Sequence, residues 1–208
     1  MVEAKTVSKW FIKKNPYLVS GYIDENTKLN KFLYFANLYS FAVNGEAMMP
    51  DSFIAFPNGS VIFDIYKDYR YNGLSSFLED DIKIDENYLK ILNVVNFVYG
   101  NMKKDDLVDL SHTHNVWNDV KECNPHNHRI VFENADKKLI EKCKEIYKAY
   151  ENVNFELLKK EVINGNVFYY YSDNIETLTD SMIEELMTLP EDDEAHFIEL
   201  MDGELIVS

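Results

Sequence analysis

Cysteine is scarce in this sequence, and so are long apolar runs. Two cysteines among 208 residues are too few for a disulfide framework, and no Cys-x-x-Cys pair occurs. Both are therefore expected to be free thiols in a reducing compartment. The N-terminal segment lacks the apolar run of a secretory signal, and no 18-residue apolar stretch is present. We therefore expect a cytoplasmic protein without an export signal or a membrane span.

Signature motifs of several enzyme classes are also missing. None of GxGxxG, GxxxxGK[ST], HExxH or GxSxG occurs, so nothing indicates a dinucleotide site, a P-loop, a zinc protease or a serine hydrolase. Carboxylates are abundant, but no pattern among them assigns acid and base roles. The sequence therefore predicts a protein that is not an enzyme and has no cofactor.

Basic residues are absent from the last 36 residues, which contain 12 acidic ones. The whole chain has 21 basic and 36 acidic residues and a formal charge of -15, so residues 1–172 carry 21 basic and 24 acidic residues, or -3. This balance argues against direct binding of nucleic acid, because proteins that bind nucleic acid neutralise its phosphates with lysine and arginine side chains. It favours a basic protein surface as the partner, and it marks residues 173–208 as an acidic partner-binding segment.

Helical spacing of apolar residues dominates the first 120 positions. The clearest helix covers residues 29–43, with Thr27 as its N-cap and Gly45 at its end. Another runs from Asp85 to Gly100, and further helices are predicted over residues 7–11, 60–70 and 104–118, with a turn at residues 57–59. Residues 1–120 are thus predicted to form an all-helical domain.

The pattern is mixed after residue 120. We predict strands at residues 129–133 and 167–171, helices at 135–150, 154–164 and 176–189, and a hairpin of residues 196–200 with 204–207. Gly165 is assigned to the end of the second helix. The expected fold class is mainly α (α+β). It comprises a helical domain (1–120), an extension of helices and short strands packed on it (121–172), and the acidic segment (173–208).

Four of the five histidines and one thiol lie within 17 residues, and imidazole with thiolate is a ligand set that zinc prefers. Their spacing matches no standard zinc motif, and a His-x-His pair does not share a helix face. We therefore favour structural or solvated histidines and predict no metal. The alternative is a zinc-dependent enzyme built on His112, His114, Cys123 and His126.

A run of aromatic residues at 168–171 is typical of a strand. Stacking platforms for RNA occur with basic grooves, whereas this run adjoins acidic residues, so core packing and a protein interface are the two interpretations. The candidate partner-binding residues combine these tyrosines with residues of the acidic segment: Tyr169, Tyr170, Tyr171, Met182, Glu184, Glu185, Asp192 and Asp193.

Four segments of residues 4–118 form a recognisable series. They are VSKWFI (7–12), KLNKFLYFA (28–36), FIAFPNGSV (53–61) leading to Tyr66, and LVDLSH (107–112) leading to Trp117. In order and spacing they resemble the Panacea domain family, which includes SocA-like and phage-associated GepA-like antitoxins. The matching motif residues are Lys28, Leu29, Lys31, Tyr34, Gly59, Val61, Tyr66, His112 and Trp117.

The sequence departs from the family pattern at three positions. Phe56, Ser60 and Ser111 stand where the family usually has tryptophan, proline and threonine. The resemblance also implies that His112 belongs to a fold motif and is not a metal ligand.

This resemblance implies an antitoxin of a bacterial or prophage toxin–antitoxin pair that neutralises a cognate toxin by direct binding. Toxins paired with the family include enzymes that block translation, among them small-alarmone-synthetase-like enzymes that modify tRNA. Assembly with the toxin or with a second copy of the chain would fit this role. The alternative is a phage-encoded acidic inhibitor, or DNA mimic, that acts on a host defence protein.

Overall fold

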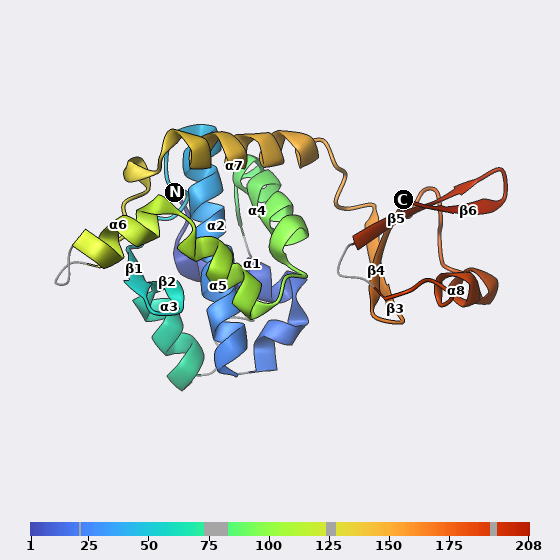
Figure 1. Cartoon of the computed structure of the whole chain (residues 1–208), viewed down its shortest axis with the longest axis horizontal. Coiled ribbons are helices and arrows are strands. Elements are labelled where there is room, and N and C mark those ends of the chain that lie inside the picture. The colour runs from blue at the N-terminus through green and yellow to red at the C-terminus, as the bar shows by residue number, and fades with distance from the viewer. Residues whose placement is uncertain (21, 73–82, 124–127, 192–194) are drawn as a thin grey trace. The chain divides into compact units, whose positions relative to one another are not determined.

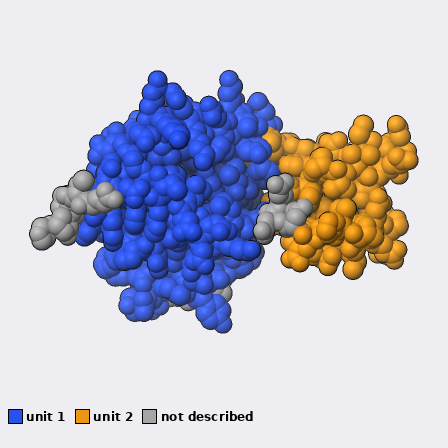
Figure 2. Space-filling view, viewed as in Figure 1, with its two compact units in different colours: residues 1–152 blue, residues 153–208 orange. Residues whose placement is uncertain are grey.

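Two units make up the chain, residues 1–152 and residues 153–208 (Figures 1 and 2). The computed structural model describes all residues except 21, 73–82, 124–127 and 192–194. The sequence analysis expected boundaries at residues 120 and 172. The first unit extends further because helix α7 (Lys137–Tyr150) packs on helix α2 (Ile23–Asn44). The second unit spans residue 172 because strands β4 (Asn166–Tyr171) and β5 (Ala195–Met201) pair in one sheet.

Helix α2 is the centre of the first unit (Figure 1). It contacts α1 (Ala4–Lys14), α4 (Glu86–Tyr99), α5 (Lys104–His112) and α7. The predicted apolar stripe is core, since Leu29 and Leu33 are fully buried. The helix begins four residues before the expected cap, and the Thr27 hydroxyl donates to the Ile23 carbonyl at 3.0 Å. It ends at Gly45 as predicted, with a φ of 77°.

The predicted caps and spacing also locate other helices of this unit. Asp85 caps α4, because its side chain accepts a hydrogen bond from the Asn87 amide at 2.9 Å. Asp136, which the sequence analysis did not name as a cap, caps α7 in the same way through the Leu139 amide at 2.7 Å. Helix α1 is present, and residues 104–118 fall in α5 and α6 (Asn115–Cys123). A 3-10 turn, η1 (Pro16–Ser20), follows α1.

The prediction that residues 1–120 are all-helical is wrong. Strands β1 (Phe53–Phe56) and β2 (Gly59–Ile62) form an antiparallel hairpin, and the helix expected from residue 60 begins only at α3 (Phe63–Lys67), followed by the π-turn η2 (Asp68–Asn72). The turn over residues 57–59 is where it was predicted, and Gly59 closes it with a φ of 95°. Such a turn brings two extended segments together, and their pairing overrides the helical spacing of residues 60–66.

The strand predicted at residues 129–133 is reduced to a single bridge. Arg129 pairs with Ile54, and η4 (Phe132–Asn134) is a 3-10 turn. The backbone amide of Ile130 donates to the Phe53 carbonyl at 2.8 Å, so this segment extends the β1–β2 hairpin by only one rung.

The second unit is a four-stranded sheet in the order β3 (Leu158–Ile163), β4, β5 and β6 (Glu204–Val207). The helix predicted at residues 154–164 is wrong, because β3 pairs antiparallel with β4. Asn164 and Gly165 both have positive φ, which is the geometry of a tight hairpin turn. The strand at 167–171 and the C-terminal hairpin are confirmed. The acidic helix is shorter than predicted, as α8 (Asp180–Leu186).

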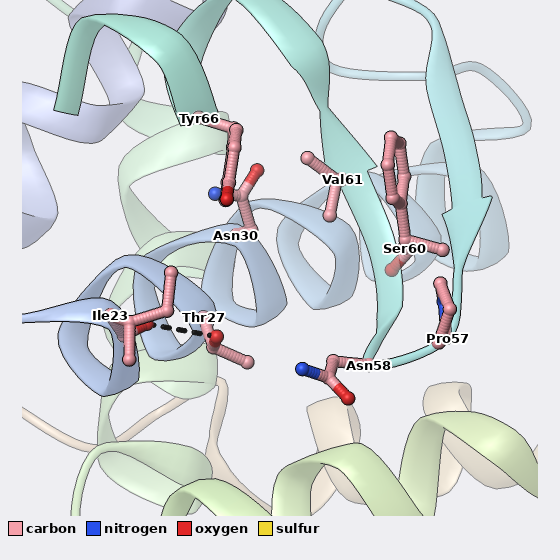
Figure 3. A pocket seen from close by; sticks show the side chains of 9 residues that line it. Ile23, Thr27, Asn30, Pro57, Asn58, Ser60, Val61 and Tyr66 are labelled. Atoms are coloured by element: carbon pink, nitrogen blue, oxygen red, sulfur yellow. Dashed lines mark hydrogen bonds between the residues drawn. The ribbon is translucent and has the colours of Figure 1, made fainter. Parts of the chain in front are cut away.

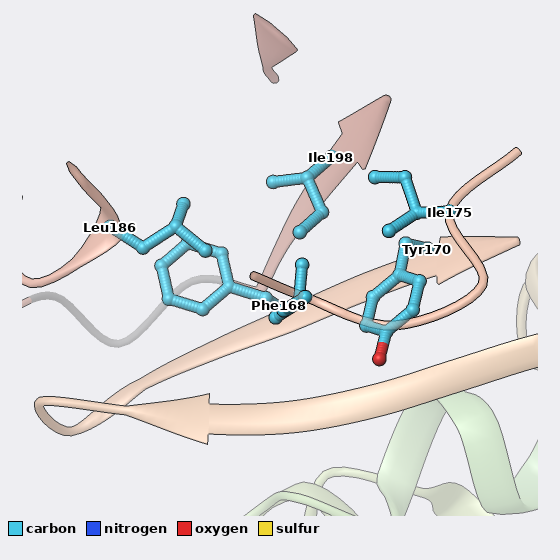
Figure 4. Close-up of a cluster of buried hydrophobic side chains, with 6 residues drawn as sticks. Phe168, Tyr170, Ile175, Leu186 and Ile198 are labelled. Carbon is cyan, nitrogen blue, oxygen red and sulfur yellow. The ribbon is translucent and has the colours of Figure 1, made fainter. Parts of the chain in front are cut away.

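A small apolar core holds the second unit together. Figure 4 shows side chains of β4, β5, α8 and the segment after β4 facing one another, namely Phe168, Tyr170, Ile175, Leu186 and Ile198. The two units together give the expected class, mainly α with short strands. No helix in the described part of the chain is long and apolar enough to cross a membrane.

Candidate functional site

Three segments that are distant in the sequence meet at the turn of the β1–β2 hairpin. A Cβ atom built on Gly59 would overlap Lys31 Nζ from α2 and would lie 2.8 Å from Ser111 Oγ of α5. The positive φ of Gly59 also disfavours other residues. Two independent constraints therefore require glycine here, and they bring the motif residues Lys31 and Gly59 into direct contact.

Lys31 is fully buried at this turn. No hydrogen-bond partner of its Nζ atom is found among the described residues. Burial lowers the pKa of Lys31 to about 7 from an ordinary value near 10.5. An amine in this position is costly to charge, because transfer of an ion from water to the protein interior is unfavourable unless a partner compensates it.

His112 and Trp117, two further motif residues, stack on each other near Lys31. Their ring centroids are 3.8 Å apart and their planes are inclined by 23°. Burial and the Lys31 charge lower the pKa of His112, and Asp109 opposes this shift. In the part of the chain that is described, His112 Nε2, Trp117 Nε1 and Ser60 Oγ are also buried without a hydrogen-bond partner. Ser111 Oγ donates to the Val108 carbonyl at 2.8 Å.

The remaining motif residues have separate roles. Leu29 is core, and the fully buried Tyr34 shares a hydrogen bond of 2.9 Å between its hydroxyl and His114 Nδ1. Lys28 lies over the Tyr17 ring, with Nζ 4.6 Å from the centroid. These contacts fix α2 against its surroundings and do not reach the Gly59 turn.

Val61 and Tyr66 line a pocket beside the same turn. Figure 3 shows Ile23, Thr27 and Asn30 of α2 on one side and Asn58, Ser60 and Val61 of the hairpin on the other. Its volume is about 170 Å³. Ser60 belongs to the wall of this pocket and follows Gly59 in the chain, so the pocket lies next to the Lys31 site.

The histidine cluster does not assemble a metal site within the described residues. No group of three histidine, cysteine, aspartate or glutamate side chains there could hold a metal ion. His112 is stacked on Trp117, and burial lowers the pKa of His114, which bonds to Tyr34, to about 4. His126 and the side chain of Cys123 lie outside the described residues.

The candidate partner-binding residues of the second unit occupy different environments. Tyr170 belongs to the small core and is 2% exposed, and Tyr169 is also buried, whereas Tyr171 and Met182 are half-buried. Two acidic candidates, Glu184 and Glu185, are exposed on α8, and two, Asp192 and Asp193, lie outside the described residues.

Sequence reasoning identified Lys31, Gly59, His112 and Trp117 as motif residues, and His112 also as a ligand of the alternative zinc site, but it missed the cluster that they form. One signal was available. Between residues 29 and 43, Lys31 is the only charged residue in an otherwise apolar and neutral helix. A helix of this composition is surrounded on all sides, so its single charge must be buried as well.

Comparison with protein families finds a match over part of the chain. Residues 29–118 match the family model described as "Antitoxin SocA-like, Panacea domain", which confirms the resemblance over that stretch. Lys31, Gly59, Ser60, Ser111, His112 and Trp117 all lie within it. Neither the curated proteins nor the solved structures contain a match to this chain.

Proposed function

We propose that this chain is an antitoxin that neutralises a cognate toxin by direct protein binding, not by catalysis. The match of residues 29–118 to a SocA-like antitoxin domain supports the class of function. The charge distribution supports the mode of binding. Residues 153–208 contain 14 acidic and 2 basic residues, a formal charge of -12, whereas residues 1–152 contain 22 and 19, or -3. The acidic unit is the part that we assign to the toxin contact.

In this proposal, electrostatic attraction brings the antitoxin and the toxin together. A toxin that blocks translation by acting on tRNA or a nucleotide, such as a small-alarmone-synthetase-like enzyme, presents cations to phosphate groups. Exposed carboxylates such as Glu184 and Glu185 on α8 would occupy these cations and exclude the substrate. Complementary charge of this kind accelerates association and favours the correct partner.

Apolar anchors for such a contact are available on the sheet of the second unit. Alternation along the strands places Tyr171 of β4 and Ile206 of β6 on the face opposite Phe168 and Tyr170. Ile206 is 42% exposed, and Met201 on the same face is 56% exposed. Tyr171 is therefore a better anchor than Tyr170, and truncation of an anchor should act mainly on the dissociation rate.

Co-expression tests the function itself. The toxic product of a gene beside this one should arrest growth alone, and expression of this chain should restore growth and co-purify with that product. Rescue without a physical complex would contradict neutralisation by binding. Complexes of equal strength with unrelated DNA-binding proteins would indicate a nucleic-acid mimic instead.

Charge neutralisation tests the assigned surface. The fourfold variant of Glu184 and Glu185 to Gln and of Asp192 and Asp193 to Asn should lower the association rate with the toxin by about tenfold at low salt. It should also weaken the salt dependence of that rate and leave the dissociation rate nearly unchanged.

A matched control removes four exposed carboxylates from the first unit. This variant changes the net charge by the same amount and should associate close to the wild-type rate. Equal rates for wild type and the second-unit variant would rule out the acidic unit as the electrostatic contact. The control replaces Glu3, Asp106, Glu133 and Glu145 with their amides.

A further inference from the structure

Another pocket of the first unit lies where helices α6 and α7 begin. Its volume is about 260 Å³, and the residues that line it are Thr113, His114, Asn115, Asp136, Lys138, Leu139 and Lys142. His114 and Leu139 are buried, whereas Thr113 and the two lysines are exposed, so the pocket has a closed floor and a mouth that opens to solvent. A cavity of about 150 Å³ can hold a molecule of the size of benzene, so this pocket has room for a small metabolite.

Asn115 holds two walls of this pocket together. Its side-chain amide donates a hydrogen bond to the Asn134 carbonyl at 2.8 Å, and its Oδ1 atom accepts one from the Asp136 amide at 3.0 Å. Asn115 is the first residue of α6, and Asp136 is the N-cap of α7. The start of one helix is thereby tied to the start of the other, so the pocket is formed without a ligand.

Two lysines at the mouth of the pocket have no counter-ion. Lys138 and Lys142 are four residues apart on α7 and therefore lie on one face of the helix. No ion pair or hydrogen bond of either side chain is found among the residues that the structure describes. Two like charges at this spacing disfavour a helix, and an anion held between them would remove the repulsion. The third charged group of the lining is Asp136, whose Oδ1 atom accepts a hydrogen bond from the Leu139 amide.

His114 provides a hydrogen-bond donor at the floor. It is 8% exposed, and its Nδ1 atom shares a hydrogen bond of 2.9 Å with the hydroxyl of the fully buried Tyr34. No second partner of this hydroxyl is found in the described part of the chain, so it leaves its proton unpaired unless it donates to Nδ1. We therefore assign the proton of the neutral ring to Nε2. This atom has no hydrogen-bond partner among the described residues and, unlike Lys31 Nζ, it is not fully enclosed.

Electrostatic interactions place the floor and the mouth within reach of one another. Burial lowers the pKa of His114 to about 4, the charge of Lys142 adds to this shift, and Asp136 opposes it. The ring is therefore neutral at pH 7, and Lys142 and Asp136 are both close enough to act on it. With two lysines and one aspartate, the lining has a net charge of +1, whereas the whole chain has a formal charge of -15.

We propose that this pocket binds the phosphate group of a small molecule, with Lys138 and Lys142 at the mouth and His114 Nε2 at the floor. The two ammonium groups donate charge-assisted hydrogen bonds, and His114 donates a neutral one. A phosphate group has a charge near -2 at pH 7, so it can compensate both lysines, whereas a carboxylate compensates only one. The N-termini of α6 and α7 also favour a phosphate.

This site does not rest on the proposed antitoxin function. The toxin contact is assigned to the second unit, whereas all residues of the pocket belong to the first. Lys138 and Lys142 also lie outside residues 29–118, so the site is not a part of the matched family domain alone.

An NMR titration of the full chain, labelled with ¹⁵N, measures both the affinity and the place of binding. The probes are inorganic phosphate and glycerol 3-phosphate at about pH 7.5, where both are mainly dianions. Either probe should cause saturable shifts of the backbone amides of residues 113–115 and 136–142, and sodium chloride at equal ionic strength should not. Tighter binding of glycerol 3-phosphate would assign the site to phosphate esters, and equal binding would assign it to the free ion. Shifts that do not saturate, or that chloride reproduces, would overturn the proposal.

Lysine variants of α7 test the assigned ligands. Lys138→Met and Lys142→Met should each weaken phosphate binding by about tenfold or more. Lys144→Met is the matched control, because Lys144 is an exposed lysine of the same helix that does not line the pocket, and it should retain the wild-type affinity. All three side chains are exposed, so these substitutions leave the core intact. Equal losses in the three variants would reduce the effect to net charge and contradict the site.

The imidazole of His114 gives a second readout that needs no variant. Its side-chain ¹⁵N signals in the free protein should show a neutral ring with the proton on Nε2, and saturating phosphate should shift the Nε2 signal. A proton on Nδ1, or an Nε2 signal that phosphate leaves unchanged, would contradict the proposed floor of the site.

Discussion

The buried amine of Lys31 should make the stability of the first unit depend on pH in a defined direction. Burial lowers its pKa from an ordinary value near 10.5 to about 7 in the folded protein. Between these two values the unfolded chain binds a proton that the folded chain does not. The free energy of unfolding therefore rises with pH across this window, and below about pH 7 the penalty reaches its full, constant value.

The size of the effect follows from the two pKa values. Each unit of difference in pKa corresponds to about 1.4 kcal/mol between the protonation states. Integration of the proton linkage between pH 7 and pH 9.5 gives a loss of about 3 kcal/mol at the lower pH. Since Lys31 is fully buried, screening by solvent does not reduce this amount.

Comparison with Lys31→Met isolates this contribution, because other titrating groups affect both proteins alike. Urea unfolding, followed by the fluorescence of Trp10 and Trp117, measures the free energy of unfolding of the first unit, because both tryptophans lie in it. The gain in stability from Lys31→Met should be about 3 kcal/mol larger at pH 7 than at pH 9.5. The control Lys67→Met should change little at either pH, because Lys67 is partly exposed and paired with Asp64. An equal gain at both pH values would refute a neutral, buried Lys31.

Three further predictions concern packing, the hairpin turn and metal. Leu33→Ala should destabilise the first unit by about 2–5 kcal/mol in urea unfolding, because Leu33 is fully buried in α2. An unchanged unfolding midpoint would show that Leu33 does not pack in the core. Gly59→Ala should cost more stability than Gly45→Ala, since both glycines have positive φ but only Gly59 has neighbours within 4 Å, and equal losses would exclude the contact with Lys31. A metal chelator should leave the circular dichroism melt unchanged, whereas a fall of several degrees would indicate a structural metal.

Local signals predicted the helices of the first unit well. Asp85 and Gly100 bracket α4, and the Asp85 side chain does cap its first turn. The end of α2 at Gly45 was also predicted correctly. Capping and helical spacing act within a few residues of one another, so a short window of sequence contains the information.

Strands required information that a short window does not contain. The spacing of residues 154–164 suits a helix, yet β3 forms there because it pairs with β4 through the Asn164–Gly165 turn. The β1–β2 hairpin was missed for the same reason. A strand is stabilised by its neighbours, and the register of that pairing decides whether Tyr170 or Tyr171 faces the core.

The candidate site could not be predicted from a short window either, because it depends on contacts across the whole first unit. Lys31, Gly59 and His112 could be identified as motif residues, but their meeting depends on how α2, the hairpin and α5 pack together. Glycine at position 59 allows both the turn and the approach of the Lys31 amine. A buried lysine is costly to a fold when no partner compensates its charge, and loss of its proton lowers that cost. Lys31 is therefore the residue at which the energetic cost of this packing can be measured.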